Sequence, residues 1–142
     1  MISLEEAAAE LDEIADNIPN EFFIQLNGGI CILPDIKYHP ELPSGRYFIL
    51  GEYIRNSGLG RYICIYYGSF SQVYRNAPKH VWREKLQEVL RHELRHHVEG
   101  LAGVNDLEVE DARFVAEAKE RERNAKMPGC ANGTAIAGCI TA

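Results

Sequence analysis

His92-Glu93-Leu94-Arg95-His96 reads H-E-x-x-H and lies inside the longest helical pattern of the chain. On an α-helix, two residues that are four apart lie one turn apart on the same face. Two imidazoles in this arrangement can hold one metal ion, and the glutamate between them can reach a water molecule at that ion. The motif therefore predicts a zinc-hydrolase helix, against the alternative of a solvated, charged helix face that happens to carry histidines.

The residues around the motif predict a long helix. Asn76 is a candidate N-cap, Pro78 suits the first turn, and neither glycine nor proline follows before Gly100. This spacing predicts about five to six helical turns. We expect an apolar stripe of this helix to pack on the core while His92 and His96 face a cleft. The stripe consists of Leu86, Leu90, Leu94, Val98 and Leu101.

A zinc-hydrolase site needs a third protein ligand and leaves one position for water. The glycines near the end of this helix predict that the helix stops and that the chain reverses. Asp106, Glu108, Glu110 and Asp111 follow the reversal. Asp106 is the first candidate ligand, with Glu108 and Glu110 as alternatives. For Glu108, Glu110 and Asp111, the favoured interpretation is that they charge the first turn of the next helix.

Val89–Asp111, with the sequence VLRHELRHHVEGLAGVNDLEVED, resembles the small bacterial zincin-like metallopeptidases. Members of that family carry H-E-x-x-H-H followed by a glycine and an aspartate. Phe48–Arg55, FILGEYIR, and Ile63–Phe70, ICIYYGSF, are similar to two strands of the same family. The resemblance covers most of the chain and implies a minimal zincin-like fold.

The resemblance also implies roles for individual residues. It implies that His92, His96 and Asp106 bind one Zn²⁺ ion and that Glu93 is the general base. The chain departs from the family pattern at Glu99–Ala102, which resembles an insertion of about one helical turn before the glycine and the aspartate. Because of this insertion, the alternatives to Asp106 stay open.

The remaining patterns predict an α+β fold with a single domain over residues 1–126. Ser3 followed by Glu6 predicts a capping box at the start of the first helix. Periodicity predicts helices at Ser3–Ile18 and Leu107–Lys126. A small, mostly antiparallel sheet of three strands is expected, in which the last two strands form a hairpin. The expected strands are Gly29–Leu33, Arg46–Arg55 and Arg61–Tyr67, and residues 127–142 are expected to form a flexible tail.

Several other residues are candidates for supporting the site. We expect His97 to pack under the site or to support it by hydrogen bonding, because it points about 100° away from His96 around the helix. Tyr66 and Tyr67 are expected in the sheet and the core, and either one is a candidate donor to an oxyanion. His39 lies in a predicted loop and is expected at the surface.

These patterns together predict a zinc metallopeptidase that acts on a peptide or protein substrate. The zinc ion would activate a water molecule, and Glu93 would take its proton and deliver it to the leaving amine. The alternative is a catalytically silent metal-binding or regulatory module on a zincin scaffold. Such a module would not need to keep Glu93 as a base.

The composition excludes other classes. A net charge of −6 gives no electrostatic basis for binding nucleic acid. The sequence has no apolar run of about 18 residues, so no membrane span is expected. The four cysteines form no C-x-x-C pair, which argues against a structural zinc site and predicts free thiols in a reducing cytoplasm.

Overall fold

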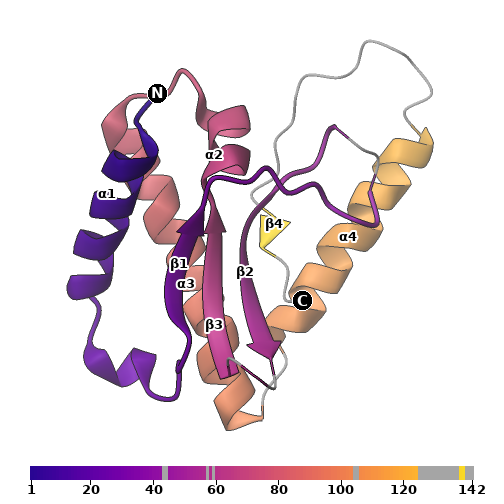
Figure 1. The fold of residues 1–142 in the computed structure, drawn as a ribbon. Helices are drawn as coiled ribbons and strands as arrows, with labels where there is room; N and C mark the ends of the chain where they lie inside the picture. Colours follow the sequence, from indigo (N-terminus) through magenta and orange to yellow (C-terminus); the bar gives the residue numbers. More distant parts are fainter. Residues whose placement is uncertain (43–44, 57, 59, 104–105, 125–137, 140–142) are drawn as a thin grey trace.

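The structure is a computed structural model, and it describes residues 1–42, 45–56, 58, 60–103, 106–124 and 138–139. As predicted, the fold is α+β, with helices packed against a sheet (Figure 1). In chain order the elements are α1 (Leu4–Asp16), the 3-10 helix η1 (Asn20–Phe23), β1 (Gly29–Leu33), β2 (Ile49–Asn56), β3 (Gly60–Tyr66), α2 (Tyr67–Tyr74), α3 (Lys79–Ala102), α4 (Asp106–Asn124) and β4 (Gly138–Cys139).

The sheet is mixed, and its strand order is β1-β3-β2-β4. β2 and β3 form the predicted antiparallel hairpin, but β1 pairs with β3 in parallel and β4 pairs with β2 in parallel. The three predicted strands are present as β1, β2 and β3, but the prediction of a mostly antiparallel sheet is wrong. A short turn fixes the relative direction of β2 and β3, whereas the long connection between β1 and β2 allows either direction for β1.

The main hydrophobic core lies between the sheet and the helices α1 and α3. The capping box of α1 is confirmed, because Ser3 Oγ accepts a hydrogen bond from the Glu6 N–H at 3.1 Å and a Glu6 carboxylate oxygen accepts one from the Ser3 N–H at 3.3 Å. The first half of α3 is anchored by residues that are fully buried in this core, namely Trp82, Leu86 and Leu90. This anchoring fixes the direction in which the second half of α3 presents the motif.

The ends of α3 differ from the prediction. Pro78 rather than Asn76 is the N-cap, and it makes no side-chain capping bond. The helix runs through Gly100 and ends at Gly103, which has a left-handed φ of 75°. Glycine adopts this conformation without steric cost, so it is the residue that ends the helix. With 24 residues, α3 is about one turn longer than predicted.

α2 was not predicted from the sequence. The strand expected to include Tyr67 ends at Tyr66, and α2 begins at Tyr67. A short apolar run does not distinguish a strand from a buried helix. Gly68 lies so close to the backbone of Pro34 and Asp35 that a Cβ at this position would lie 2.6 Å from it. The close approach brings α2 against the end of β1.

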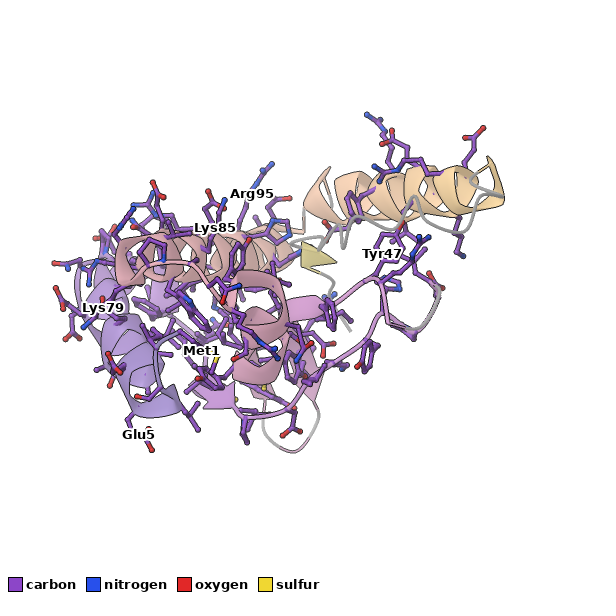
Figure 2. All side chains as sticks on the ribbon, turned by 90° about the horizontal axis from the view of Figure 1, so that it is seen from above. Met1, Glu5, Tyr47, Lys79, Lys85 and Arg95 are labelled. Carbon is purple, nitrogen blue, oxygen red and sulfur yellow. The ribbon has the colours of Figure 1, made fainter. Side chains whose placement is uncertain are left out.

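α4 stands beside the sheet, outside the main core (Figures 1 and 2). Of the α4 side chains that the structure describes, only Ala118 is buried, and it packs with Leu42 and Tyr47 from the connection between β1 and β2. Lys119 Nζ lies 3.8 Å from a carboxylate oxygen of Glu41 in the same connection. α4 is thus held by a small apolar cluster and a surface ion pair.

His39 lies in this connection and is buried, contrary to the expected surface position. Its Nδ1 accepts a hydrogen bond from the Glu41 N–H at 3.0 Å, while its Nε2 has no hydrogen-bond partner among the described residues. Burial lowers the pKa of His39, the Glu41 carboxylate raises it, and the Lys119 ammonium lowers it further, with a net lowering. The fold therefore favours the neutral imidazole.

Most of the predicted flexible tail, residues 127–142, lies outside the described residues. Within it, Gly138 and Cys139 form β4 and pair with Ile49 and Gly51 of β2. Among the helices that the structure describes, none has the length and the apolar character needed to cross a bilayer.

We predict that His39→Asn weakens the dependence of stability on pH. Because folding lowers the pKa of His39, its contribution to stability is complete above the unfolded-state pKa of about 6.5 and is lost as the pH falls below it. Asparagine keeps an acceptor for the Glu41 N–H but does not titrate. The slope of the unfolding free energy between pH 5 and pH 6.5, measured with urea, should fall by up to about 1.4 kcal/mol per pH unit.

His80→Asn is the matched control, because His80 is exposed at the start of α3. An unchanged slope for His39→Asn, or an equal change in both variants, would show that burial of His39 does not create the pH dependence.

Candidate metal centre

The buried face of α3 changes from apolar to polar along the helix. Its first half buries Trp82, Leu86, Val89 and Leu90, and its second half buries Glu93, His96 and His97 together with Leu94. Val98 and Leu101 are 37% and 39% exposed, so their predicted place in the buried stripe is wrong. The hydrophobic pattern selected these two residues, but the face set by the first half of the helix passes through Glu93 and His97.

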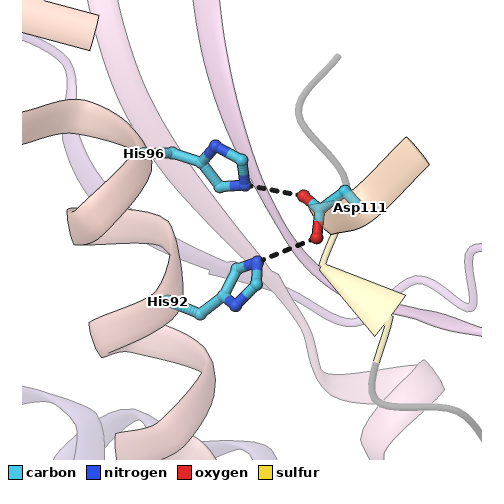
Figure 3. A group of neighbouring side chains, drawn as sticks. All are labelled: His92, His96 and Asp111. Atoms are coloured by element: carbon cyan, nitrogen blue, oxygen red, sulfur yellow. Dashed lines mark hydrogen bonds and ion pairs between the residues drawn. The ribbon is translucent and has the colours of Figure 1, made fainter. Parts of the chain in front are cut away.

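His92, His96 and Asp111 converge between α3 and α4 (Figure 3). His96 Nε2 lies 2.8 Å from Asp111 Oδ2, and His92 Nε2 lies 3.5 Å from Asp111 Oδ1. One potential ligand atom from each residue falls within 4.8 Å of the other two. We call these three residues the candidate metal centre.

The donor set of this centre fits zinc. Two imidazole nitrogens and one carboxylate oxygen are common zinc ligands, and a fourth position remains for another group. Tetrahedral ligands at about 2.0–2.2 Å from zinc lie about 3.3–3.6 Å from one another. The separation of 3.5 Å between His92 Nε2 and Asp111 Oδ1 already lies in this range, and His92 Nε2 has no hydrogen-bond partner among the described residues. The distance between His96 Nε2 and Asp111 Oδ2, now 2.8 Å, would have to increase by roughly half an ångström.

Charge also favours a cation here. Burial alone would raise the pKa of Asp111, but the neighbouring imidazoles of His92 and His96 outweigh it and hold the pKa below its ordinary value. Asp111 is therefore an ionised carboxylate facing two nitrogens. The side chains of His96, Asp111 and His92 are 2%, 17% and 29% exposed, and the Nε2 atom of His92 is buried.

The geometry of the helix pair explains why Asp111 is the acid that reaches the histidines. α3 continues for about 9 Å of rise from His96 to Ala102, and α4 then returns for about 7.5 Å from Asp106 to Asp111 (Figure 1). The return brings Asp111 level with His96. Asp106, the predicted ligand, is the first residue of α4 and lies at the reversal.

The side chains of Asp106, Glu108 and Glu110 lie outside the described residues, so their predicted roles stay predictions. The sequence contains one signal for Asp111. The favourable effect of a helix dipole on an acid falls off within the first turn. Asp111 comes after that turn, so the dipole does not account for a carboxylate at this position.

Glu93 is fully buried, and neither of its carboxylate oxygens has a hydrogen-bond partner among the described residues. Desolvation raises its pKa well above the ordinary value, and the carboxylates of Asp111 and Glu52 raise it further. An unpartnered buried carboxyl group is costly for the fold. It is also what a general base requires, because its proton affinity is raised and it keeps its oxygens available.

His97 supports the position of α3. Its Nε2 donates a hydrogen bond to the Ile24 carbonyl at 2.7 Å, so Nδ1 accepts one from the Tyr53 hydroxyl at 2.8 Å when the ring is neutral. Burial lowers the pKa of His97 despite the bond to Ile24, which favours this neutral form. His97 therefore connects α3 to β2 and to the segment after η1, consistent with the expectation that it packs under the site.

The hydroxyls of the two candidate oxyanion donors already have partners. Tyr66 donates to the buried Glu52 carboxylate at 2.7 Å, and Tyr67 donates to the Ile2 carbonyl. Glu52 also forms an ion pair with Lys37. These bonds place Tyr66 in a polar cluster on the sheet and tie Tyr67 to the N-terminal segment.

Comparisons with known proteins identify a relative whose description names no activity. No protein-family model matches the chain, and no curated protein matches it. A solved structure described as a conserved hypothetical protein from Thermo thermophilus is 32% identical and superposes with a TM-score of 0.62. The match covers 71% of this chain and 98% of that chain.

We predict that Glu93→Gln stabilises the metal-free protein. The substitution keeps the shape of the side chain and removes a carboxyl group whose ionisation, favourable in the unfolded chain, is opposed by burial in the folded protein. The free energy of unfolding in urea, measured at pH 7 on chelator-treated protein, should rise by roughly 1–2 kcal/mol.

Glu88→Gln is the control on the same helix, because the Glu88 side chain is 61% exposed. It should change stability by less than about 0.5 kcal/mol. Equal or lower stability of Glu93→Gln would mean that the buried carboxyl group is satisfied in solution.

Proposed function

The chain belongs to the family of this conserved hypothetical protein from Thermo thermophilus, and from the chemistry of its candidate metal centre we propose that it is a zinc-dependent metallopeptidase. One observation carries the proposal. The two motif histidines and Asp111 present ligand atoms within 4.8 Å of one another, and the motif glutamate beside them is buried without a hydrogen-bond partner. A helix face selected for solubility would not bury Glu93 and His96.

In this proposal His92, His96 and Asp111 hold one zinc ion. When bound, zinc supplies Lewis-acid chemistry that lowers the pKa of water and polarises a substrate carbonyl. Glu93 accepts the proton of the attacking water and returns it to the leaving amine. Its raised pKa supports both steps, because a carboxyl group with an ordinary pKa would hold the proton too weakly to deliver it near neutral pH.

The resemblance of the helix motif to zincin-like metallopeptidases supports a peptide as the substrate. α3 would then be the active-site helix of a minimal zincin-like fold, and the edge of β2 near α3 would hold an extended peptide by strand addition. β2 contacts α3, and within the described part of the chain its outer edge pairs with β4 at Ile49 and Gly51. Tyr53 and Ile54 follow along the same strand. We also propose a reducing, cytoplasmic location, supported by the free thiols of Cys31 and Cys64.

A second candidate is a metal-binding or regulatory module without turnover. The observation that favours it is β4, because this segment of the chain occupies part of the strand edge that a substrate would use. Both candidate functions require metal binding, so the first test measures zinc binding by the proposed ligands. The second test measures peptide cleavage, which separates the two candidates.

We predict that Asp111→Asn lowers the affinity for zinc by more than about 100-fold, beyond the loss that outer-shell residues cause. A neutral amide at this position removes the anionic ligand between the histidines. Affinity is measured by competition with a chromogenic chelator on protein prepared without metal.

The matched variants are Asp106→Asn, Glu108→Gln and Glu110→Gln, which should each change zinc affinity by less than about tenfold. A large loss in one of these variants, with Asp111→Asn unaffected, would transfer the ligand role to that residue. Failure of wild-type protein to bind one equivalent of zinc would remove both candidate functions.

We predict that Glu93→Gln binds zinc like the wild type but cleaves peptides on the order of 10²–10⁴-fold more slowly, because it lacks the general base. Cleavage is measured with a broad peptide library and zinc-loaded protein. Chelator-treated wild type is the control for metal dependence. Equal cleavage by both proteins would indicate a contaminating peptidase, and zinc binding without cleavage by the wild type would favour the silent module.

A further inference from the structure

Two cysteines, Cys31 and Cys64, lie side by side on the neighbouring strands β1 and β3. Cys31 of β1 is the register partner of Cys64 of β3, and the two strands are parallel. Their Sγ atoms are 2.9 Å apart. Side chains of register partners point to the same face of a sheet, so the contact between the sulfurs follows from the strand pairing.

The backbone geometry suits a disulfide. Neighbouring strands are about 4.7–4.9 Å apart, which lies within the Cα separations of about 4.4–6.8 Å found in disulfides. A sulfur–sulfur bond is about 2.04 Å long, so the Sγ atoms would approach by about 0.9 Å from their present 2.9 Å. Side-chain rotation can supply a movement of this size without a change in strand register.

The two thiols have unequal surroundings. Cys64 is buried among Ile49 and Tyr66, whereas Cys31 is half-buried at the edge of this cluster. Burial raises the pKa of Cys64 to about 12, and the neighbouring Cys31 and the Glu52 carboxylate contribute to the increase. Cys31 is therefore the thiol that an external reagent reaches first. Cys64 is then positioned to react with the modified Cys31.

We propose that Cys31 and Cys64 form a reversible redox pair that closes to a disulfide in reaction with a low-molecular-weight disulfide such as oxidised glutathione. The Cys31 thiolate attacks one sulfur of the reagent, the reagent's sulfur–sulfur bond breaks, and one glutathione thiolate leaves. The Cys64 thiolate then attacks Cys31 Sγ and displaces the second glutathione thiolate. The two protein thiols lose two electrons, the reagent gains them, and the two thiol protons end on two glutathione molecules.

Closure would constrain the three long strands of the sheet. The two cysteines are 33 residues apart, and β2 lies entirely between them. The bond would tie β1 to β3 and enclose β2 in a covalent loop, which removes conformational freedom from the unfolded chain. This inference does not depend on metal binding or on peptidase activity.

The test maps disulfides in the full chain after native, reduced protein is incubated with oxidised glutathione at pH 8. Trypsin separates the cysteines conveniently: residues 1–37 contain Cys31, residues 62–75 contain Cys64, and residues 127–142 contain Cys130 and Cys139. After free thiols are alkylated, mass spectrometry without reduction should show peptide 1–37 linked to peptide 62–75. Dithiothreitol should release the two peptides, and the melting temperature of the oxidised protein should be higher by several degrees, roughly as loop closure predicts.

A variant with Cys130→Ser and Cys139→Ser should lose both of its remaining thiols on oxidation, and adding Cys31→Ser should abolish the linked species. Three results would overturn the proposal. They are alkylated thiols in both peptides after oxidation, a glutathione adduct on Cys31 that never resolves to the linked peptides, and linkage of either peptide to residues 127–142 in place of the expected pair.

Discussion

The contact of the Asp111 carboxylate with the two imidazoles of α3 is the interaction that joins α4 to the motif helix. None of the described side chains of α4 belongs to the main core, and Ala118 is the only one of them that is buried. Among the described side chains of α4, Asp111 contacts His92 and His96 of α3, and Lys119 forms an ion pair with Glu41. In a metal-bound protein, the same three groups would share one cation, so ligand binding and the docking of α4 would be one event.

The second half of α3 buries ionisable groups, which costs stability. At Glu93, His96 and His97 the helix buries groups that can ionise, where the first half buries Trp82 and Leu86. His97 recovers part of this cost through its bonds to Tyr53 and Ile24, and His96 recovers part of it through Asp111. Glu93 has no such compensation among the described residues. Uncompensated burial of this kind is expected at functional sites, where a local rule of stability is broken for activity.

Sequence patterns predicted the elements well and their mutual placement less well. The capping box at Ser3, the helix periodicity and the composition of the long strands are local signals, and each was followed by the expected element. The direction of β1 depends on a long connection, and α2 depends on the approach of Gly68 to a distant backbone segment, so neither was encoded locally. The same division holds at the site. The spacing of His92 and His96 is a property of one helix, whereas the identity of the acid depends on where a second helix returns.

That return is set by the length of α3. If α3 ended one turn earlier, at about Val98, the reversal would lie closer to His96, and an acid near the start of the next helix would be level with it. The segment Glu99–Ala102 moves the reversal about 6 Å further along the axis of α3. A ligand must then lie about one turn further along α4 to return to the same height, and the distance from Asp106 to Asp111 is a little more than one turn. One additional turn in each helix thus preserves the position of the acid in space while it changes the position in the sequence.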